Sequence, residues 1–231
     1  MFKPGDIISH IDMCKAEGAS LQRGMNFRLK GGHSVILMSV RKGAPYADRL
    51  EDQGQTLIYE GHDTPKNHTI TNPKSIDQPR TNGSGRPTQN GLFEEAATLY
   101  KQNKQPPEIV RVYEKIQSGI WVFNGTFRLI DAWVERSGPR NVFKFKLSLM
   151  DEVKMALTDK VQILEHARMI PTDVKREVWK RDAGQCVECG AKDNLHYDHV
   201  IPFSKGGSSL VAKNIQLLCA RHNLLKSDQI A

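Results

Sequence analysis

Two pairs of metal-binding side chains in the last fifth of this 231-residue chain constrain its fold more than any other feature. Cys186 and Cys189 form a Cys-x-x-Cys pair, and Cys219 and His222 repeat the same spacing further along the chain. Two such pairs supply the four ligands of a tetrahedral zinc ion. A segment of roughly 60 residues has too small a hydrophobic core to be stable by itself, and a bound metal supplies the missing stability. We therefore predict a structural Zn²⁺ held by these four side chains.

The composition favours a soluble protein with a polyanionic partner. Lys and Arg number 33 against 26 Asp and Glu, which gives a net charge of +7 and favours DNA or RNA as the partner. The longest apolar runs, such as residues 35–38, are far too short to cross a bilayer. The first residues lack the apolar stretch of a secretion signal, and four cysteines do not make a disulfide scaffold in a chain of this length. We expect a cytoplasmic protein without membrane contact.

Residues 1–150 are predicted to be mostly β-strands. Phe143 and Phe145 alternate with lysines, which is the period-two pattern of a strand with one face in a core. Asn124-Gly125 is a hairpin-turn signal between two such runs. The runs predicted as strands are residues 32–40, 55–59, 108–114, 120–123, 126–134 and 141–149. Several short strands separated by turns predict a small barrel or sandwich.

One helix and one long loop interrupt these strands. Leu92, Ala96, Leu99 and Tyr100 recur at helical spacing, so a helix is predicted around them. Residues 62–90 contain four prolines and no periodicity, and they hold four Lys or Arg side chains against two Asp. A loop of this length is usually functional or disordered. We interpret it either as a solvated flexible loop or as a loop that contacts DNA.

A second unit is predicted to start near Pro171. Val174 and Val178 lie four positions apart beside Trp179, which indicates a short helix just after this proline. The preceding segment has some helical character and is interpreted as a connection. The predicted division is therefore a domain at residues 1–150, a linker at 151–170 and a second domain at 171–231.

Polar motifs lie between and after the two metal-binding pairs. Asp198 and His199 stand next to each other, Asn214 precedes the second pair, and Asn223 and Lys226 follow it. This order closely resembles the HNH nucleases, whose metal finger consists of two strands and a helix. The resemblance covers the whole of the second domain and implies an endonuclease that hydrolyses phosphodiester bonds in DNA.

The HNH resemblance implies a role for each of these residues. His199 matches the general base that activates water, Asp198 and Asn223 match the ligands of the catalytic divalent ion, and Asn214 matches the asparagine that braces the loop. This division suits the chemistry, because a neutral imidazole can accept a proton at pH 7. A hard ion such as Mg²⁺ or Mn²⁺, held by carboxylate and amide oxygens, would neutralise the phosphate. Lys226 either reaches a phosphate or is solvated.

One departure from the HNH pattern concerns His222, since many members of that family have a cysteine there. His222 could instead serve the catalytic ion, which would leave the zinc with three thiolates. His196 is interpreted as an ordinary strand residue. Cys14 lies far from the other cysteines and is interpreted as a buried apolar thiol.

Two tyrosines, Tyr46 and Tyr59, flank an acidic stretch that contains glycine. With the aromatic strands that follow, this order resembles the SRA domain, which flips modified cytosine out of the duplex. The resemblance implies that the two tyrosines cover the faces of the flipped base and that Asp48 accepts hydrogen bonds from its Watson–Crick edge. Asp52 is the alternative edge reader. The competing interpretation makes the tyrosines ordinary core residues and Asp48 a surface charge.

Together these features predict an α+β protein, with an SRA-like β-barrel and flanking helices followed by a zinc-stapled ββα HNH domain. The preferred function is a modification-dependent endonuclease that flips 5-methylcytosine or 5-hydroxymethylcytosine in double-stranded DNA and cuts nearby. A homodimer is expected on DNA, because one HNH site cuts one strand. The alternatives are an HNH endonuclease or nickase that reads unmodified sequence, and a non-catalytic protein that binds modified DNA.

Overall fold

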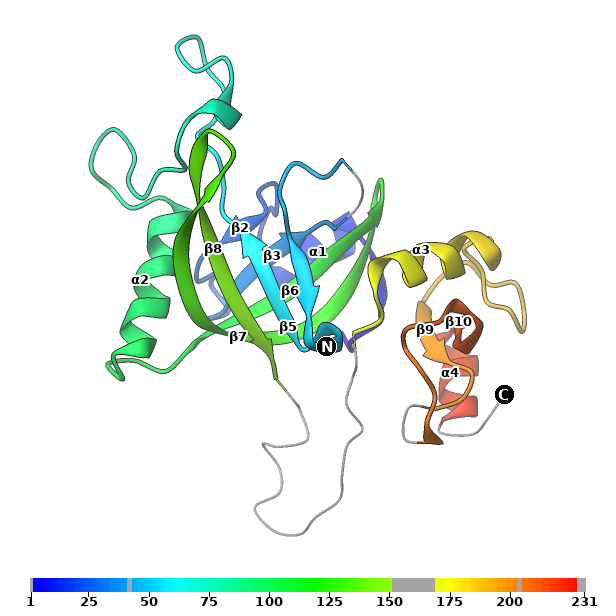
Figure 1. Ribbon diagram of the computed structural model, residues 1–231. Helices are drawn as coiled ribbons and strands as arrows, with labels where there is room; N and C mark the ends of the chain where they lie inside the picture. The colour runs from blue at the N-terminus through cyan, green and yellow to red at the C-terminus, as the bar shows by residue number, and fades with distance from the viewer. Residues whose placement is uncertain (1, 41–42, 151–168, 203–204, 228–231) are drawn as a thin grey trace.

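The computed structural model describes residues 2–40, 43–150, 169–202 and 205–227, which form an α+β fold (Figure 1). Most of the predicted linker, residues 151–168, and residues 228–231 of the predicted nuclease domain lie outside the described part of the chain. In the described residues, the N-terminal part is built on one eight-stranded sheet and the C-terminal part on a two-stranded sheet. No helix in these ranges has the length and apolar character needed to span a bilayer.

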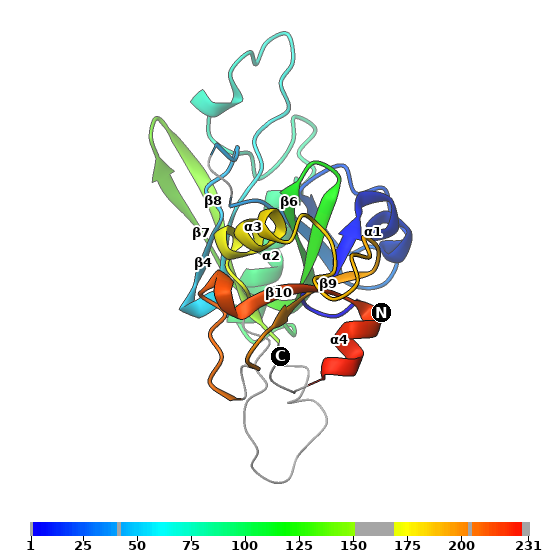
Figure 2. The same ribbon diagram turned by 90° about the vertical axis from the view of Figure 1, so that its right-hand side faces the viewer.

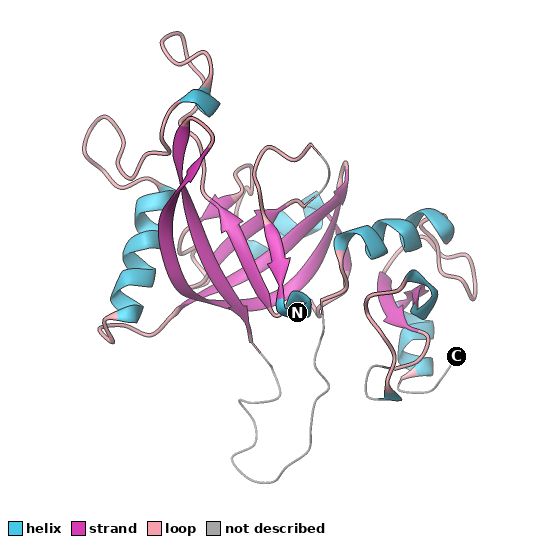
Figure 3. Ribbon diagram, viewed as in Figure 1, coloured by secondary structure: helices cyan, strands magenta, loops and turns pink. Residues whose placement is uncertain are grey.

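The large sheet runs in the order β2-β3-β6-β7-β8-β5-β4, and β1 pairs with β7. Its strands are β1 (Ile7–Ser9), β2 (Met25–Asn26), β3 (Ser34–Met38), β4 (Arg49–Glu51), β5 (Thr56–Glu60), β6 (Glu108–Gln117), β7 (Ile120–Ser137) and β8 (Arg140–Leu149). All neighbours are antiparallel except β3 and β6, which are parallel. The long strands β7 and β8 curve across the sheet (Figure 3).

The predicted β-barrel is not closed in the described residues, although the α+β class is confirmed. The sheet ends at β2 on one side and at β4 on the other, and these two strands do not pair with each other. They are only two and three residues long. Short edge strands limit unwanted pairing with other chains. The barrel prediction is therefore corrected to an open, curved sheet.

The predicted hairpin turn at Asn124-Gly125 is wrong, because β7 continues through both residues. The pairing of β6 and β7 shifts register opposite Val112 and Tyr113, so Asn124 is the extra residue of a β-bulge. Gly125 has a φ of 116°, which favours glycine at this bend. The turn that joins β6 to β7 lies instead at Ser118-Gly119. The dipeptide therefore bends a strand and does not end one.

The main core lies between the large sheet and α2 (Gln89–Lys101), the helix predicted from its apolar spacing. Thr88 begins this helix, since its hydroxyl accepts a hydrogen bond from the Gly91 N–H. Phe93 is fully buried and meets Phe145 of β8 edge to face, with ring centroids 5.8 Å apart. A second helix, α1 (His10–Glu17), follows β1 directly.

The long loop at residues 62–90 is attached to the sheet at several points. Asp77 accepts hydrogen bonds from the backbone and side chain of Asn141, and the Gln78 side chain joins Gly61 to Phe143. The loop also contains a single 3-10 turn at Pro73–Ser75. These bonds hold the base of the loop beside β8, while most side chains between residues 65 and 75 are exposed.

The C-terminal unit has the order α3 (Thr172–Arg181), β9 (Leu195–His199), β10 (Ile215–Cys219) and α4 (Ala220–Lys226). β9 and β10 pair in antiparallel register, and α4 follows β10 directly. The predicted helix at Val174 and Val178 is α3, and both valines are buried. In Figures 1 and 2 this unit lies against one end of the large sheet. The hairpin places Asp198 and His199 beside Asn214, and α4, which carries Asn223 and Lys226, follows β10 directly.

Candidate metal centre, catalytic strand and base pocket

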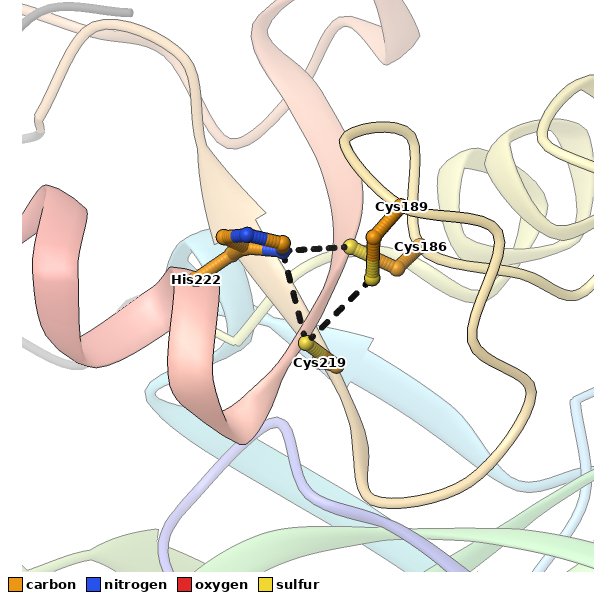
Figure 4. A group of neighbouring side chains, drawn as sticks. All are labelled: Cys186, Cys189, Cys219 and His222. Atoms are coloured by element: carbon orange, nitrogen blue, oxygen red, sulfur yellow. Dashed lines mark hydrogen bonds between the residues drawn. The ribbon is translucent and has the colours of Figure 1, made fainter.

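The four predicted zinc ligands come together in one cluster (Figure 4). Their ligand atoms all lie within 4.8 Å of one another. The Nδ1 atom of His222 lies 3.4 Å from the Cys186 sulfur and 3.5 Å from the Cys219 sulfur. The Cys189 and Cys219 sulfurs lie 3.9 Å apart.

These separations fit a tetrahedral zinc site. Zn–S bonds of about 2.3 Å and Zn–N bonds of about 2.0 Å put the ligand atoms of such a site roughly 3.5–3.8 Å apart. Because Nδ1 of His222 lies among the sulfurs, the geometry favours His222 as the fourth zinc ligand over a role at the catalytic ion.

Local backbone geometry explains how the sequence makes this cluster. The Gly190 N–H donates to the Cys186 carbonyl, and the Cys186 N–H donates to the Ala191 carbonyl, which folds the first pair into a tight knuckle. Gly190 has a φ of 73°, a conformation that suits glycine. Burial opposes ionisation of the Cys186 thiol, but hydrogen bonds from the Cys219 backbone and from His222 lower its pKa to about 6. A thiol with this pKa is readily deprotonated for metal binding.

Asp198 and His199 lie at the end of β9, opposite Gln216 and Ile215 of β10. Lys226 of α4 reaches back to this strand: its Nζ atom lies 2.8 Å from Asp198 Oδ2 and donates to the His199 carbonyl at 2.5 Å. The Lys226 side chain is only 9% exposed, so it is not the freely solvated lysine that the sequence left open. Strand and helix are thus joined at the predicted catalytic residues.

The two predicted asparagines lie in different surroundings. Asn214 is buried; its side chain accepts from the Ile201 N–H at 2.8 Å and donates to the Ile201 and Ser208 carbonyls. It therefore braces the loop between β9 and β10. Asn223 is half-buried on α4, three residues before Lys226. Residues three apart share a helix face, so Asn223 lies on the face of α4 from which Lys226 reaches Asp198.

His199 has a hydrogen-bond partner that sequence reasoning missed. The Ser209 hydroxyl is buried and lies 2.8 Å from His199 Nε2. Burial lowers the pKa of His199; Asp198 partly opposes this shift and Lys226 adds to it. The ring is therefore neutral near pH 7. Nothing in the sequence marks Ser209, which follows the Gly206-Gly207 turn as an ordinary loop serine.

The predicted base-binding residues line a cavity of about 810 Å³ in the N-terminal part. Tyr46, Asp48 and Tyr59 are all in its wall. The Asp48 carboxylate accepts hydrogen bonds from the backbone N–H groups of Ser39 and Glu60, at 3.2 and 3.0 Å. Burial raises the pKa of Asp48 to about 7, against the effect of these two donors. The carboxylate is therefore held by the backbone inside the cavity.

Asp52, the alternative edge reader, is not among the residues that line this cavity. It begins the 3-10 turn Asp52–Gly54, and its carboxylate accepts from the Thr56 hydroxyl at 2.8 Å. The geometry therefore favours Asp48 over Asp52.

His62 is the cavity residue that sequence reasoning missed. Its ring stacks on Tyr46 with centroids 5.3 Å apart and planes at 18°, and its Nε2 atom lies 3.0 Å from the Tyr59 hydroxyl. Burial lowers its pKa to about 4, so the ring is neutral. The two predicted base-stacking tyrosines are thus joined through His62, and the Lys74 ammonium lies 4.1 Å from the centre of the Tyr46 ring. In the sequence, the position of His62 between Gly61 and Asp63, just after Tyr59, is the feature that could have identified it as a site residue.

The comparisons with known proteins concern both parts of the chain. Residues 186–229 match the family model described as HNH endonuclease. A solved complex of the SUVH5 SRA domain with hemi-methylated CG DNA is 23% identical, with a TM-score of 0.43, over 71% of this chain and 94% of that chain. The phosphorothioation-dependent restriction endonuclease ScoMcrA is 17% identical, with a TM-score of 0.42, over 98% of this chain and 55% of that chain.

A third solved structure, KRYPTONITE with mCHH DNA, a histone H3 peptide and SAH, is 13% identical, with a TM-score of 0.41, over 71% of this chain and 34% of that chain. The search of curated proteins gives no match. The HNH resemblance of the C-terminal segment is thus confirmed by the family model over residues 186–229.

Proposed function

We propose that this protein is a modification-dependent DNA endonuclease, which binds an extruded 5-methylcytosine or 5-hydroxymethylcytosine and hydrolyses a nearby phosphodiester bond. The observation that carries the proposal is that one chain combines a segment matching the HNH endonuclease family with a cavity lined by two tyrosines and a half-buried carboxylate. The net charge of +7 suits a DNA partner.

In the nuclease, His199 acts as the general base. With Nε2–H donating to the Ser209 hydroxyl, Nδ1 is the ring nitrogen that can take a proton from water. The lowered pKa of His199 keeps this nitrogen unprotonated at pH 7. Asn214 holds the loop that carries Ser209 through its bonds to Ile201 and Ser208. It is a positioning residue and does not contact the reacting atoms.

Asp198 and Asn223 would hold the catalytic Mg²⁺ or Mn²⁺. A carboxylate and an amide oxygen are the ligands that such hard cations prefer. The site suits a cation, since the Lys226 ammonium already lies 2.8 Å from the Asp198 carboxylate. When bound, the ion supplies charge neutralisation at the scissile phosphate. With an ion on Asp198, the Lys226 ammonium would be repelled from this carboxylate, because the ammonium and the ion are both positively charged, and it would then be available to a phosphate oxygen. A structural Zn²⁺ would be held by Cys186, Cys189, Cys219 and His222.

In the cavity, Tyr46 and Tyr59 stack on the extruded base, and Asp48 accepts from its exocyclic amine. Extrusion costs a few kcal/mol of lost stacking and pairing. Aromatic stacking returns about 1–3 kcal/mol per base. The carboxylate oxygens of Asp48 each keep a lone pair beyond the backbone bonds from Ser39 and Glu60, and this supplies a further hydrogen bond.

One digestion experiment tests this function. A plasmid is prepared unmodified, with 5-methylcytosine and with 5-hydroxymethylcytosine, and each form is incubated with the protein and Mg²⁺ or Mn²⁺. We expect cutting of the modified forms, no cutting with a chelator and no cutting by His199→Ala. Equal cutting of all three plasmids would contradict the recognition of modified cytosine and would still support the nuclease activity. Absence of cutting in every case, with modified DNA still bound, would favour a non-catalytic binding protein.

A second candidate is an HNH endonuclease or nickase that reads unmodified DNA. The observation that favours it is the occupied pocket: Tyr46 already contacts His62 and Lys74, which compete with a base for its ring. For the preferred function, His62 or Lys74 must move when the base enters. The plasmid comparison separates these two functions.

A further inference from the structure

We infer that Glu114 of the large sheet and Lys175 of the nuclease unit, here named the docking pair, hold the nuclease at one position relative to the base cavity. The distance along DNA between the modified base and the cut follows from this position. The inference rests on the proposed function, since it presupposes that the protein binds a modified base and cuts the DNA nearby.

The docking pair is completely removed from solvent. Lys175 lies on α3, and its Nζ atom is 2.7 Å from a Glu114 carboxylate oxygen on β6. Glu114 is 0% exposed and Lys175 is 1% exposed. The positive charge of Lys175 holds the pKa of Glu114 below its usual value despite its burial, so the Glu114 carboxyl is ionised.

Two neutral side chains complete the polar network, one from each part of the chain. Asn124, the bulge residue of β7, accepts from Lys175 at 2.6 Å and donates to Glu114 at 3.0 Å. The Thr172 hydroxyl of α3 donates to the other Glu114 oxygen. The bulge therefore places the Asn124 side chain where it hydrogen-bonds both Glu114 and Lys175.

Lys175 is also connected to the catalytic strand. Tyr197 of β9 donates its hydroxyl to the Lys175 carbonyl at 2.8 Å, and Asp198 and His199 are the next two residues. At the other end of this contact, Asp6 pairs with His196 at 2.7 Å, and the Gly5 carbonyl accepts from the Tyr197 N–H. The strand with the catalytic residues is thus bonded to α3 through the Tyr197 hydroxyl and to the segment just before β1 through His196 and the Tyr197 backbone.

Apolar packing surrounds these polar contacts. One buried cluster contains side chains from the sheet, from α3 and from the β9–β10 hairpin, and its buried members are Ile116, Val122, Ile170, Val174, Val178, Tyr197, Ile215 and Leu217. Met169, just before α3, is buried in the main core against Gly54. The nuclease unit and the sheet therefore share hydrophobic core.

A buried charge pair gives this interface one geometry. Apolar surfaces tolerate small displacements, whereas sliding the interface would leave the Glu114 and Lys175 charges buried without partners, which is strongly unfavourable. The apolar cluster supplies the attraction between the two parts, and the docking pair selects the register.

The test maps cut positions on a DNA duplex with a single 5-methylcytosine, for the wild type, Lys175→Met and the double variant Glu114→Gln, Lys175→Met. Lys180→Met is the matched control, since Lys180 is exposed on the same helix. We expect a narrow set of cut positions for the wild type and the control, and a broad set for Lys175→Met. The double variant should restore the narrow set, because it leaves no unpaired charge.

Hydrogen exchange of the proteins without DNA gives a second readout that does not depend on cutting. Lys175→Met should increase exchange in α3 and β9 and leave β7 and β8 protected, and the double variant should reverse the increase. Wild-type exchange and wild-type cut positions in a folded Lys175→Met protein would overturn the docking role. If the wild type does not cut or does not prefer the modified base, the proposed function fails, and the exchange comparison still decides the role of the docking pair.

Discussion

Asp48 is half-buried in the cavity wall, and its desolvation there determines how its charge responds to pH. Burial raises the pKa of Asp48 from its ordinary value of 3.8 to about 7. The folded protein therefore binds a proton more tightly here than the unfolded chain does. The stabilising contribution of this proton is complete below about pH 4 and is lost as the pH rises through about 7.

This titration predicts how Asp48→Asn changes stability with pH. Asparagine has no proton to lose, so the wild type should lose stability relative to this variant as the pH rises from 5 to about 8. Urea unfolding of both proteins across this range measures the difference. A difference in unfolding free energy that is constant with pH would contradict the raised pKa. Asp52→Asn is the matched control, because Asp52 is outside the cavity.

Tyr59 is fully buried in the cavity wall, and its hydroxyl contacts His62. Tyr59→Ala should weaken binding to DNA with modified cytosine by about tenfold, since stacking is worth about 1–3 kcal/mol per base. Tyr59→Phe keeps the ring and should retain most of the preference. Binding titrations on matched duplexes with and without 5-methylcytosine measure both effects. Retention of the full preference in Tyr59→Ala would remove this residue from base recognition.

His199→Ala should abolish cutting and leave DNA affinity and the preference for modified DNA unchanged. The base acts on water in the transition state, whereas affinity depends on phosphate and base contacts elsewhere. Gel-shift titration and a cleavage assay on the same duplexes separate the two properties. Residual cutting close to the wild-type rate would assign the general base to another residue.

Individual residues also show where prediction from sequence ends. The Cys and His ligands were found because zinc requires fixed spacings in the chain, and the structure brings all four together. Ser209 and His62 were missed because each acts through a contact that no local spacing specifies. The sequence pattern favoured Asp48 over Asp52 only by resemblance, and the lining of the cavity, which includes Asp48 and not Asp52, distinguishes them.

Among the elements, the C-terminal unit depends most on its metal. Cys186→Ala removes one ligand and should unfold the β9–β10 hairpin and α4, with loss of one zinc per chain. β6, β7 and β8 should stay folded, because their core lies against α2. Elemental analysis and hydrogen exchange measure the two effects. Cys14→Ala is the control, since Cys14 is outside the cluster and should keep the zinc. A wild-type protein without zinc would contradict the site.

Elements were predictable where their pattern is local. The alternation at Phe143 and Phe145 identified β8, and the spacing around Ala96 identified α2. The turn prediction at Asn124-Gly125 was wrong because the same dipeptide suits both a turn and a bulge. The bulge is formed here because Asn124 is buried and bonds charged side chains from distant segments, which no local pattern reveals. Closure of the sheet was equally unpredictable, since it depends on β2 and β4, whose sequences carry no strand pattern.

For the whole molecule, one nuclease site per chain predicts two chains for a double-strand break. Nicked plasmid should accumulate first at low protein concentration, and the linear form should rise more steeply than in proportion to protein. Gel analysis over a concentration series, with sedimentation on a short modified duplex, measures this. Linear product formed in proportion to protein, with one chain on each duplex, would contradict the dimer.

Nothing in the sequence connects Glu114 with Lys175, and only the folded structure shows that they are buried together. Their arrangement also sets an order of events during synthesis. Every strand of the large sheet precedes α3 in the chain, so the ribosome releases Glu114 and Asn124 well before Lys175. N-terminal domains generally fold first as the chain emerges. Under the proposed function, the nuclease unit therefore meets a docking surface that has already formed, and a newly made chain folds the part that binds DNA before the part that cuts it.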